Sequence, residues 1–157
     1  MIDCMKVCLG GTFDPLHKGH RTLLRKAFEV AGKRGSVFIG LTSSTLAKKK
    51  GTHTSFEQRK KIIERFIEEI TTQIPFTIQP LYDTYGPSIE GDFDAIVVSP
   101  ETQETAEEIN RRRTNLGKKP LQIIQIPFVL ADDKKPISST RIRNKEIDEH
   151  GTIQGKE

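Results

Sequence analysis

The chain has 157 residues, of which 34% are hydrophobic and 29% charged, so it is long enough for one domain with a real core. No apolar run reaches about 18 residues and no apolar leader begins the sequence, which predicts a protein that crosses no membrane and stays in the cytoplasm. A net charge of +4 suits anionic ligands, including nucleic acid.

The first part of the chain predicts a β-α-β unit. Residues 5–9 and 37–41 are short apolar runs, typical of central strands in a parallel sheet. Between them, apolar side chains recur at helical spacing until Gly32 and Gly35 end the pattern. A right-handed crossover would therefore join the two strands. The residues at helical spacing are Leu23, Leu24, Ala27, Phe28 and Ala31.

The next segment predicts a polar loop and an amphipathic helix. Residues 42–54 are polar and carry the run Lys48-Lys49-Lys50, so we expect a loop at the carboxyl edge of the second strand. Ser55 and Gln58 have the spacing of a capping box, and Pro75 follows as a stop. The core face of this helix is expected to consist of Ile62, Ile63, Phe66, Ile67 and Ile70.

The second half predicts three more strands, over residues 76–81, 94–99 and 121–126. Helices are expected over about 102–113 and 137–143, the second with Ser138 or Ser139 as N-cap, and fraying is expected from about residue 150. The whole pattern predicts a single α/β domain over residues 1–157, a Rossmann-like doubly wound sheet of about five parallel strands with helices on both faces.

The two cysteines are expected to be buried free thiols. Cys4 and Cys8 lie in or beside the first strand. Four residues apart on a strand, their backbones would be separated by about 13 Å, which is too far for a disulfide.

A phosphate-binding turn is predicted between the first strand and the first helix. The segment from Gly10 to His20 reads Gly-Gly-Thr-Phe-Asp-Pro-Leu-His-Lys-Gly-His. Glycines let a ligand approach the backbone, and free amides at a helix N-terminus favour anions. His17 and His20 are three apart, so both imidazoles can donate hydrogen bonds to phosphate oxygens from one side of the helix. Zinc is a weaker alternative, because Cys4, Cys8, His53 and His150 lack finger-like spacing.

A second phosphate cradle is predicted near the other end of the chain. Residues 137–143 read Ile-Ser-Ser-Thr-Arg-Ile-Arg, which places hydroxyls and free amides at a helix start, followed by two arginines. The turn of His17 and His20 resembles the signature of the nucleotidyltransferase superfamily, and this second segment resembles the C-terminal motif of its adenylyl- and cytidylyltransferases.

The middle of the chain resembles the archaeal and eukaryotic type of phosphopantetheine adenylyltransferase. The resemblance is carried by residues 83–87 (Asp-Thr-Tyr-Gly-Pro), 97–102 (Val-Val-Ser-Pro-Glu-Thr) and 109–113 (Ile-Asn-Arg-Arg-Arg). Thr84 departs from the proline that is usual in that family. The resemblance implies transfer of AMP from ATP to 4'-phosphopantetheine, which gives dephospho-coenzyme A and pyrophosphate (EC 2.7.7.3).

The resemblance also implies roles for individual residues. His20 would bond the α-phosphate in the transition state, and His17 would bind neighbouring phosphate oxygens. Lys48, with Lys50 also in reach, would neutralise the acceptor phosphate, and Mg²⁺ would arrive with ATP, held by phosphates and water rather than by a protein metal site. In the phosphate-binding turn, the ATP-binding residues would be Gly11, Thr12 and Phe13, and Thr12 would also bind the acceptor. The adenosine would be bound by Ser99, Glu101, Thr102 and Asn110. The β- and γ-phosphates would be bound by Ser138, Ser139, Thr140 and Arg141.

Two other classes of function stay open at this point. Transferases that act on nicotinamide mononucleotide, flavin mononucleotide or glycerol phosphate share both end motifs. A non-catalytic nucleotide- or RNA-binding module would suit the positive charge, but two Tyr and no Trp leave little for base stacking, so we expect no nucleic-acid partner. A class I aminoacyl-tRNA synthetase would need tRNA-binding domains for which this chain has no room. The sequence does not specify an oligomeric state.

Overall fold

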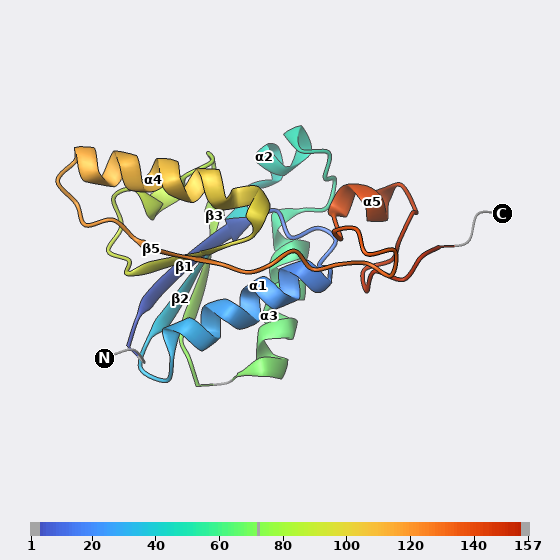
Figure 1. Ribbon diagram of the computed structural model, residues 1–157, viewed down its shortest axis with the longest axis horizontal. Coiled ribbons are helices and arrows are strands. Elements are labelled where there is room, and N and C mark those ends of the chain that lie inside the picture. Colours follow the sequence, from blue (N-terminus) through green and yellow to red (C-terminus); the bar gives the residue numbers. More distant parts are fainter. Residues whose placement is uncertain (1–3, 72, 155–157) are drawn as a thin grey trace.

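Five parallel strands form one sheet in the order β3-β2-β1-β4-β5 (Figure 1). The computed structural model describes residues 4–71 and 73–154. The strand order reverses at β1, which has β2 on one side and β4 on the other, so this is the point where a doubly wound sheet opens a crevice. The strands are β1 (Lys6–Gly11), β2 (Ser36–Thr42), β3 (Phe76–Leu81), β4 (Ala95–Val98) and β5 (Gln122–Gln125).

The strand register creates that crevice. β1 pairs with β2 along its whole length, up to Gly11 opposite Leu41. Its pairing with β4 ends much earlier, at Cys8 opposite Ile96. From Leu9 onward β1 therefore has a paired neighbour on one side only, and the end of β1 borders an open space between two strands.

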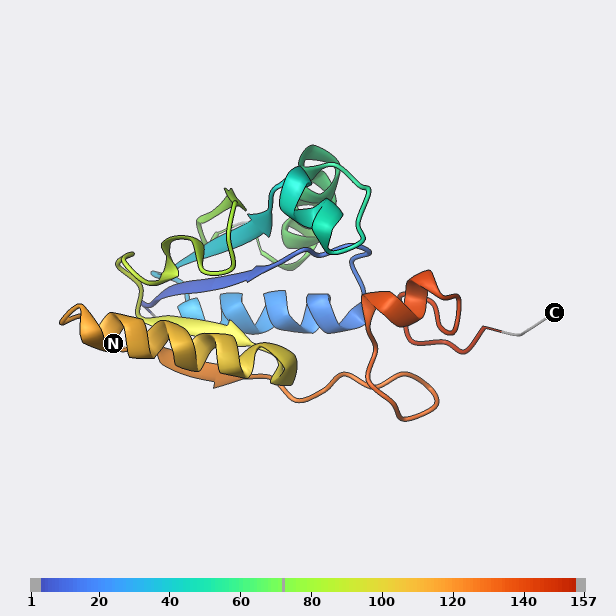
Figure 2. The same cartoon turned by 90° about the horizontal axis from the view of Figure 1, so that it is seen from above.

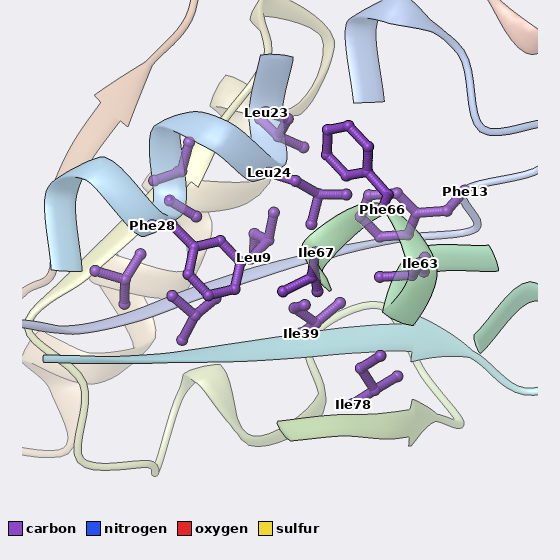
Figure 3. Close-up of a cluster of buried hydrophobic side chains, with 14 of the residues drawn as sticks. Leu9, Phe13, Leu23, Leu24, Phe28, Ile39, Ile63, Phe66, Ile67 and Ile78 are labelled. Carbon is purple, nitrogen blue, oxygen red and sulfur yellow. The ribbon is translucent and has the colours of Figure 1, made fainter. Parts of the chain in front are cut away.

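Helices cover both faces of the sheet, as the sequence predicts. α1 (Lys18–Ala31) and α3 (Phe56–Ile70) bury their apolar faces against one side, and Figure 3 shows Leu24 and Ile67 meeting Leu9 and Ile39 there. α4 (Gln103–Asn115) packs on the other side through Ala106 and Ile109. The predicted capping box at α3 is present: the Ser55 hydroxyl accepts from the Gln58 amide, and the Gln58 side chain accepts from the Ser55 amide, both at 3.2 Å.

The expected loop over residues 42–54 is interrupted by a helix. α2 (Ser44–Lys49) begins after Ser43, whose hydroxyl accepts a hydrogen bond from the Leu46 amide at 3.1 Å. Six residues with one buried side chain, Ala47, leave no apolar period in the sequence, so only the cap signals this helix. Two short 3₁₀ turns, η1 (Gly86–Ser88) and η2 (Pro100–Thr102), follow later in the chain.

The C-terminal segment is docked rather than frayed as far as Gln154. α5 (Ser139–Arg143) has Ser138 as N-cap, as predicted. Ile147 and Ile153 form an antiparallel bridge, and Ile147 joins Ala131 and Ile137 in a small core of its own. This core explains the order, because it gives the segment apolar surface to bury. Residues 155–157 lie outside the described part of the chain.

The two cysteines differ in environment. Cys8 is buried, and burial raises the pKa of its thiol to about 12. Cys4 is exposed, which corrects the expectation of two buried thiols: β1 begins only at Lys6, so Cys4 precedes the sheet. None of the described helices has the length and apolar character needed to span a membrane.

Candidate nucleotide-transfer site

The turn after β1 is tightly packed around two of its glycines. A Cβ atom at Gly11 would lie 3.2 Å from the ring of Phe13, and one at Gly19 would lie 2.9 Å from the ring of His17. Phe13 itself has a φ of 52°, an unusual value for a residue with a side chain, and is held there by near-complete burial. The turn thus brings backbone and imidazoles together at the end of β1.

His17 and His20 form the capping box of α1. The Nδ1 atom of His17 accepts hydrogen bonds from the amides of Gly19 and His20, at 3.0 and 3.3 Å. The Nδ1 atom of His20 lies 3.3 Å from the His17 amide and 3.1 Å from the Pro15 carbonyl oxygen. The two rings stack with centroids 3.7 Å apart and planes inclined by 17°.

This packing keeps both imidazoles neutral. Burial, with a smaller contribution from Arg21, lowers the pKa of His17 from 6.5 to about 4. Burial and then the neighbouring His17 lower the pKa of His20 to about 3, against the opposing effect of the Pro15 carbonyl. Because Nδ1 of His17 accepts, its proton is on Nε2. For His20, acceptance from the His17 amide corresponds to a proton on Nε2, whereas donation to the Pro15 carbonyl corresponds to a proton on Nδ1.

The second motif faces the same cavity. A cleft of about 280 Å³ is lined by the histidine turn, the end of β4 and the start of α5. Figure 2 shows α5 beside the N-terminal end of α1, and the Lys18 amide donates to the Glu149 carbonyl at 2.9 Å across this junction. The predicted site residues that line the cleft are Gly11, Phe13, His17, His20, Ser99, Glu101, Thr102, Ser138, Ser139 and Thr140.

Two residues that the sequence analysis assigns to ATP binding have protein partners instead. The Asn110 side chain donates to the Leu121 carbonyl and accepts from the Leu121 amide, at 2.9 and 2.7 Å, so it joins α4 to the start of β5 and does not line the cleft. Arg141 pairs with the carboxylates of Asp133 and Glu146. These partners occupy the guanidinium that the sequence assigns to the β- and γ-phosphates.

A second, mainly apolar cavity of about 160 Å³ lies between the sheet and α4. Lys48 and Lys50 are both exposed, but only Lys50 is among the lining residues of this cavity. The two cavities share Gly10, Gly11 and Thr102, so they meet at the end of β1. The apolar lining residues of the smaller cavity include Cys8, Phe38, Leu81, Phe93, Ile96 and Ile109.

A buried arginine holds the loop over this second cavity. Arg113 is the last residue of the segment 109–113 that carries the family resemblance, and its side chain is buried. It donates to the carbonyls of Ser88, Ile89 and Gly91 at 2.9 to 3.2 Å and to that of Lys119 at 2.8 Å. The signal in the sequence was its spacing of four from Ile109, which places it on the inner face of α4.

A second buried arginine, Arg59, was missed altogether. It is fully buried on α3, four residues before the core residue Ile63, so the same helical spacing would have pointed to it. Its guanidinium donates to the Thr12 carbonyl at 3.2 Å and to the Thr42 carbonyl at 2.8 Å. It therefore ties the phosphate turn to the end of β2.

Comparisons with known proteins show the family of the chain and similar folds. A family model described as cytidylyltransferase-like matches residues 8–145. The phosphopantetheine adenylyltransferase of Methanosarcina acetivorans is 47% identical over 152 residues, which cover 95% of this chain and 96% of that protein. The protein of the same name from Archaeoglobus fulgidus is 39% identical over 95% of this chain and 99% of its own. A crystal structure from Archaeoglobus fulgidus, of a protein described as having unknown function, superposes with a TM-score of 0.69 at 35% identity, over 78% of this chain and 89% of that one.

Proposed function

The chain belongs to the cytidylyltransferase-like family and, within it, to the phosphopantetheine adenylyltransferases; from this premise we propose how its site carries out the family's reaction. The protein transfers the adenylyl group of ATP to 4'-phosphopantetheine and releases pyrophosphate, forming dephospho-coenzyme A. This is a step of coenzyme A biosynthesis, and the protein is a nucleotidyltransferase.

The observation that supports this assignment most strongly is the meeting, at one glycine turn, of two cavities that offer different polar groups. The larger cleft has hydroxyls, amides and imidazoles, which suit a triphosphate. The smaller cavity has many apolar lining residues and a lysine among them, which suits an acceptor that has an uncharged arm and one phosphate. Their shared border at Gly10 and Gly11 is where the two phosphates would meet.

The chemistry requires no protein nucleophile. An oxygen of the acceptor phosphate attacks the α-phosphorus of ATP, the bond from that phosphorus to the bridging oxygen breaks, and pyrophosphate leaves with the electron pair. Catalysis therefore consists of alignment and stabilisation of charge. The Nε2–H of His20 would donate to the α-phosphate, and that of His17 to a neighbouring phosphate oxygen. Two neutral donors suit this task, because they add no like charge to each other at a stacking distance of 3.7 Å.

The remaining assignments follow the same division of the site. The α5 N-terminus, with Ser138, Ser139 and Thr140, would hold the β- and γ-phosphates, and Lys50 takes the acceptor phosphate in place of Lys48 because it lines the smaller cavity. Mg²⁺ would be bound by phosphate oxygens and water and would neutralise charge on them. Among the described residues, no three His, Cys, Asp or Glu side chains gather to hold a metal. Both substrates are water-soluble, so we place the reaction in the cytoplasm.

Pyrophosphate release tests the proposal. The purified protein with ATP and magnesium is offered 4'-phosphopantetheine, nicotinamide mononucleotide and flavin mononucleotide in parallel, and release is expected with the first alone. His20→Ala should lower turnover by about 100-fold or more, as loss of an oxyanion donor does. His53→Ala is the matched control, because His53 is exposed and lines neither cavity. Release with a mononucleotide would overturn the acceptor assignment, and unchanged turnover in His20→Ala would overturn the role of that residue.

A further inference from the structure

We propose that Arg59 and Thr42 are positioning residues that orient the Thr12 hydroxyl as a hydrogen-bond donor to the reacting phosphates. The proposal rests on the proposed function, because it needs phosphates at the end of β1. It concerns a line of three side chains that runs from the protein interior to the phosphate turn.

The line begins at a buried guanidinium. Arg59 has no exposed surface, and it uses four hydrogen bonds, all to uncharged oxygens. Three of these oxygens are the carbonyls of Thr54, Thr42 and Thr12; the fourth is the Thr42 hydroxyl, at 3.0 Å. Burial lowers the pKa of Arg59 and the charge of Asp14 raises it, and a guanidinium stays protonated at neutral pH.

The direction of the bonds follows from the chemistry of the groups. A guanidinium can only donate, so the Thr42 oxygen accepts from Arg59. The Thr42 proton is then given to the Thr12 hydroxyl oxygen, 3.2 Å away. Among the described residues no acceptor is found for the proton of Thr12 itself. That proton is left for a ligand.

The position of Thr12 says which ligand. Thr12 is half-buried and is not itself a lining residue of either cavity, but it lies between Gly11, which lines both cavities, and Phe13, which lines the larger one. Thr42 lines the smaller cavity and is only 2% exposed, so its link to Thr12 is shielded from water. A positive charge behind two hydroxyls in a shielded site polarises each in turn and strengthens the last one as a donor. The hydrogen-bond acceptor for the Thr12 hydroxyl is then a phosphate oxygen at the border of the two cavities, where the phosphates of ATP and of 4'-phosphopantetheine would meet.

A purely structural role makes a different prediction. Arg59 also holds three backbone carbonyls, and these bonds alone would fix the turn. Replacement of Thr42 by Val leaves those bonds in place and keeps the side-chain volume, but removes the hydroxyl. In this variant the same guanidinium nitrogen still has the Thr12 carbonyl at 3.2 Å as an acceptor. A loss of turnover would then come from the missing hydroxyl rather than from a loosened turn.

The experiment compares Thr42→Val, Thr42→Ser, Thr12→Val and the double variant Thr12→Val/Thr42→Val with the unmodified protein, using pyrophosphate release from ATP and 4'-phosphopantetheine. Thr42→Val should lower kcat about three- to tenfold, with both KM values and the unfolding temperature little changed. Thr42→Ser should restore most of the turnover. Thr12→Val should be slower still, and the double variant no slower than Thr12→Val, because Thr42 acts only through Thr12.

Two results would refute the positioning role of Thr42 while leaving the proposed function intact. One is full activity of Thr42→Val, and the other is a double variant whose loss of turnover is the product of the two single losses. Inactivity of the unmodified protein with 4'-phosphopantetheine would refute both. The circular dichroism spectrum shows whether Thr42→Val is folded. If it is not, Thr42→Ala replaces it in the comparison of turnover, because it also lacks the hydroxyl.

Discussion

Acidification should destabilise this protein well above the pH at which its carboxylates titrate, because of the histidine pair at the start of α1. Folding holds His17 and His20 neutral, with pKa values lowered from 6.5 to about 4 and about 3. Between these values and 6.5 the unfolded chain binds a proton at each imidazole that the folded protein does not. A lowered histidine pKa therefore means that stability falls as the pH drops below about 6.5.

The size of the effect follows from linkage. At pH 5 each unfolded imidazole is almost fully protonated and each folded one almost fully neutral, so each contributes about 2 kcal/mol of lost stability relative to pH 8. The pair together gives up to about 4 kcal/mol, a large part of the stability of a domain of this size. Carboxylates act later: hydrogen bonds from Arg112 and Arg141 lower the pKa values of Glu108 and Asp133 below 4.5 and 3.8, so their contributions are lost at lower pH.

Urea unfolding at pH 8 and pH 5 measures this loss, and the chain supplies its own control. Ser55 and Gln58 form a non-titrating capping box on α3, so His17→Ser/His20→Gln builds the same box on α1. This variant will be less stable overall, since Ser fills less of the buried His17 site, but its stability should change by less than about 1 kcal/mol between the two pH values. Equal losses in the variant and the unmodified protein would refute the argument from the pair.

Three further predictions concern residues that the structure reassigns. Lys50→Ala should raise the KM for 4'-phosphopantetheine about tenfold and Lys48→Ala less than about threefold; the reverse order in steady-state kinetics would return the acceptor phosphate to Lys48. Arg113→Leu leaves four carbonyls without their donor, so thermal unfolding should show a loss of stability of about 2–4 kcal/mol. The KM for 4'-phosphopantetheine should also rise, and an unchanged KM would show that the loop does not contribute to binding of that substrate. Asn110→Ala should cost about 1–3 kcal/mol through its two bonds to Leu121 with the KM for ATP unchanged, and a raised KM at unchanged stability would contradict its structural role.

Local patterns in the sequence were sufficient for the fold and for locating the two end motifs, which line one cleft. The apolar runs around Val7, Ile39 and Val97 indicated buried parallel strands, because such strands are covered on both faces. Ser55 with Gln58 and Ser138 marked helix starts, because a cap is a contact between residues three apart. The two end motifs were recognisable for the same reason: each phosphate cradle is built from one short continuous segment.

Contacts between distant segments could not be predicted in this way, because they depend on how the chain packs. The parallel strands, the helix periods and the two end motifs could be found from the sequence, since each depends on residues a few positions apart. Arg59 and Arg113 became organising residues of the site because folding brings carbonyls from separate loops around a guanidinium that cannot stay buried without acceptors. Lys50 lines the smaller cavity and Lys48 does not. This difference likewise depends on how α2 packs over the sheet, which the local spacing of residues does not encode.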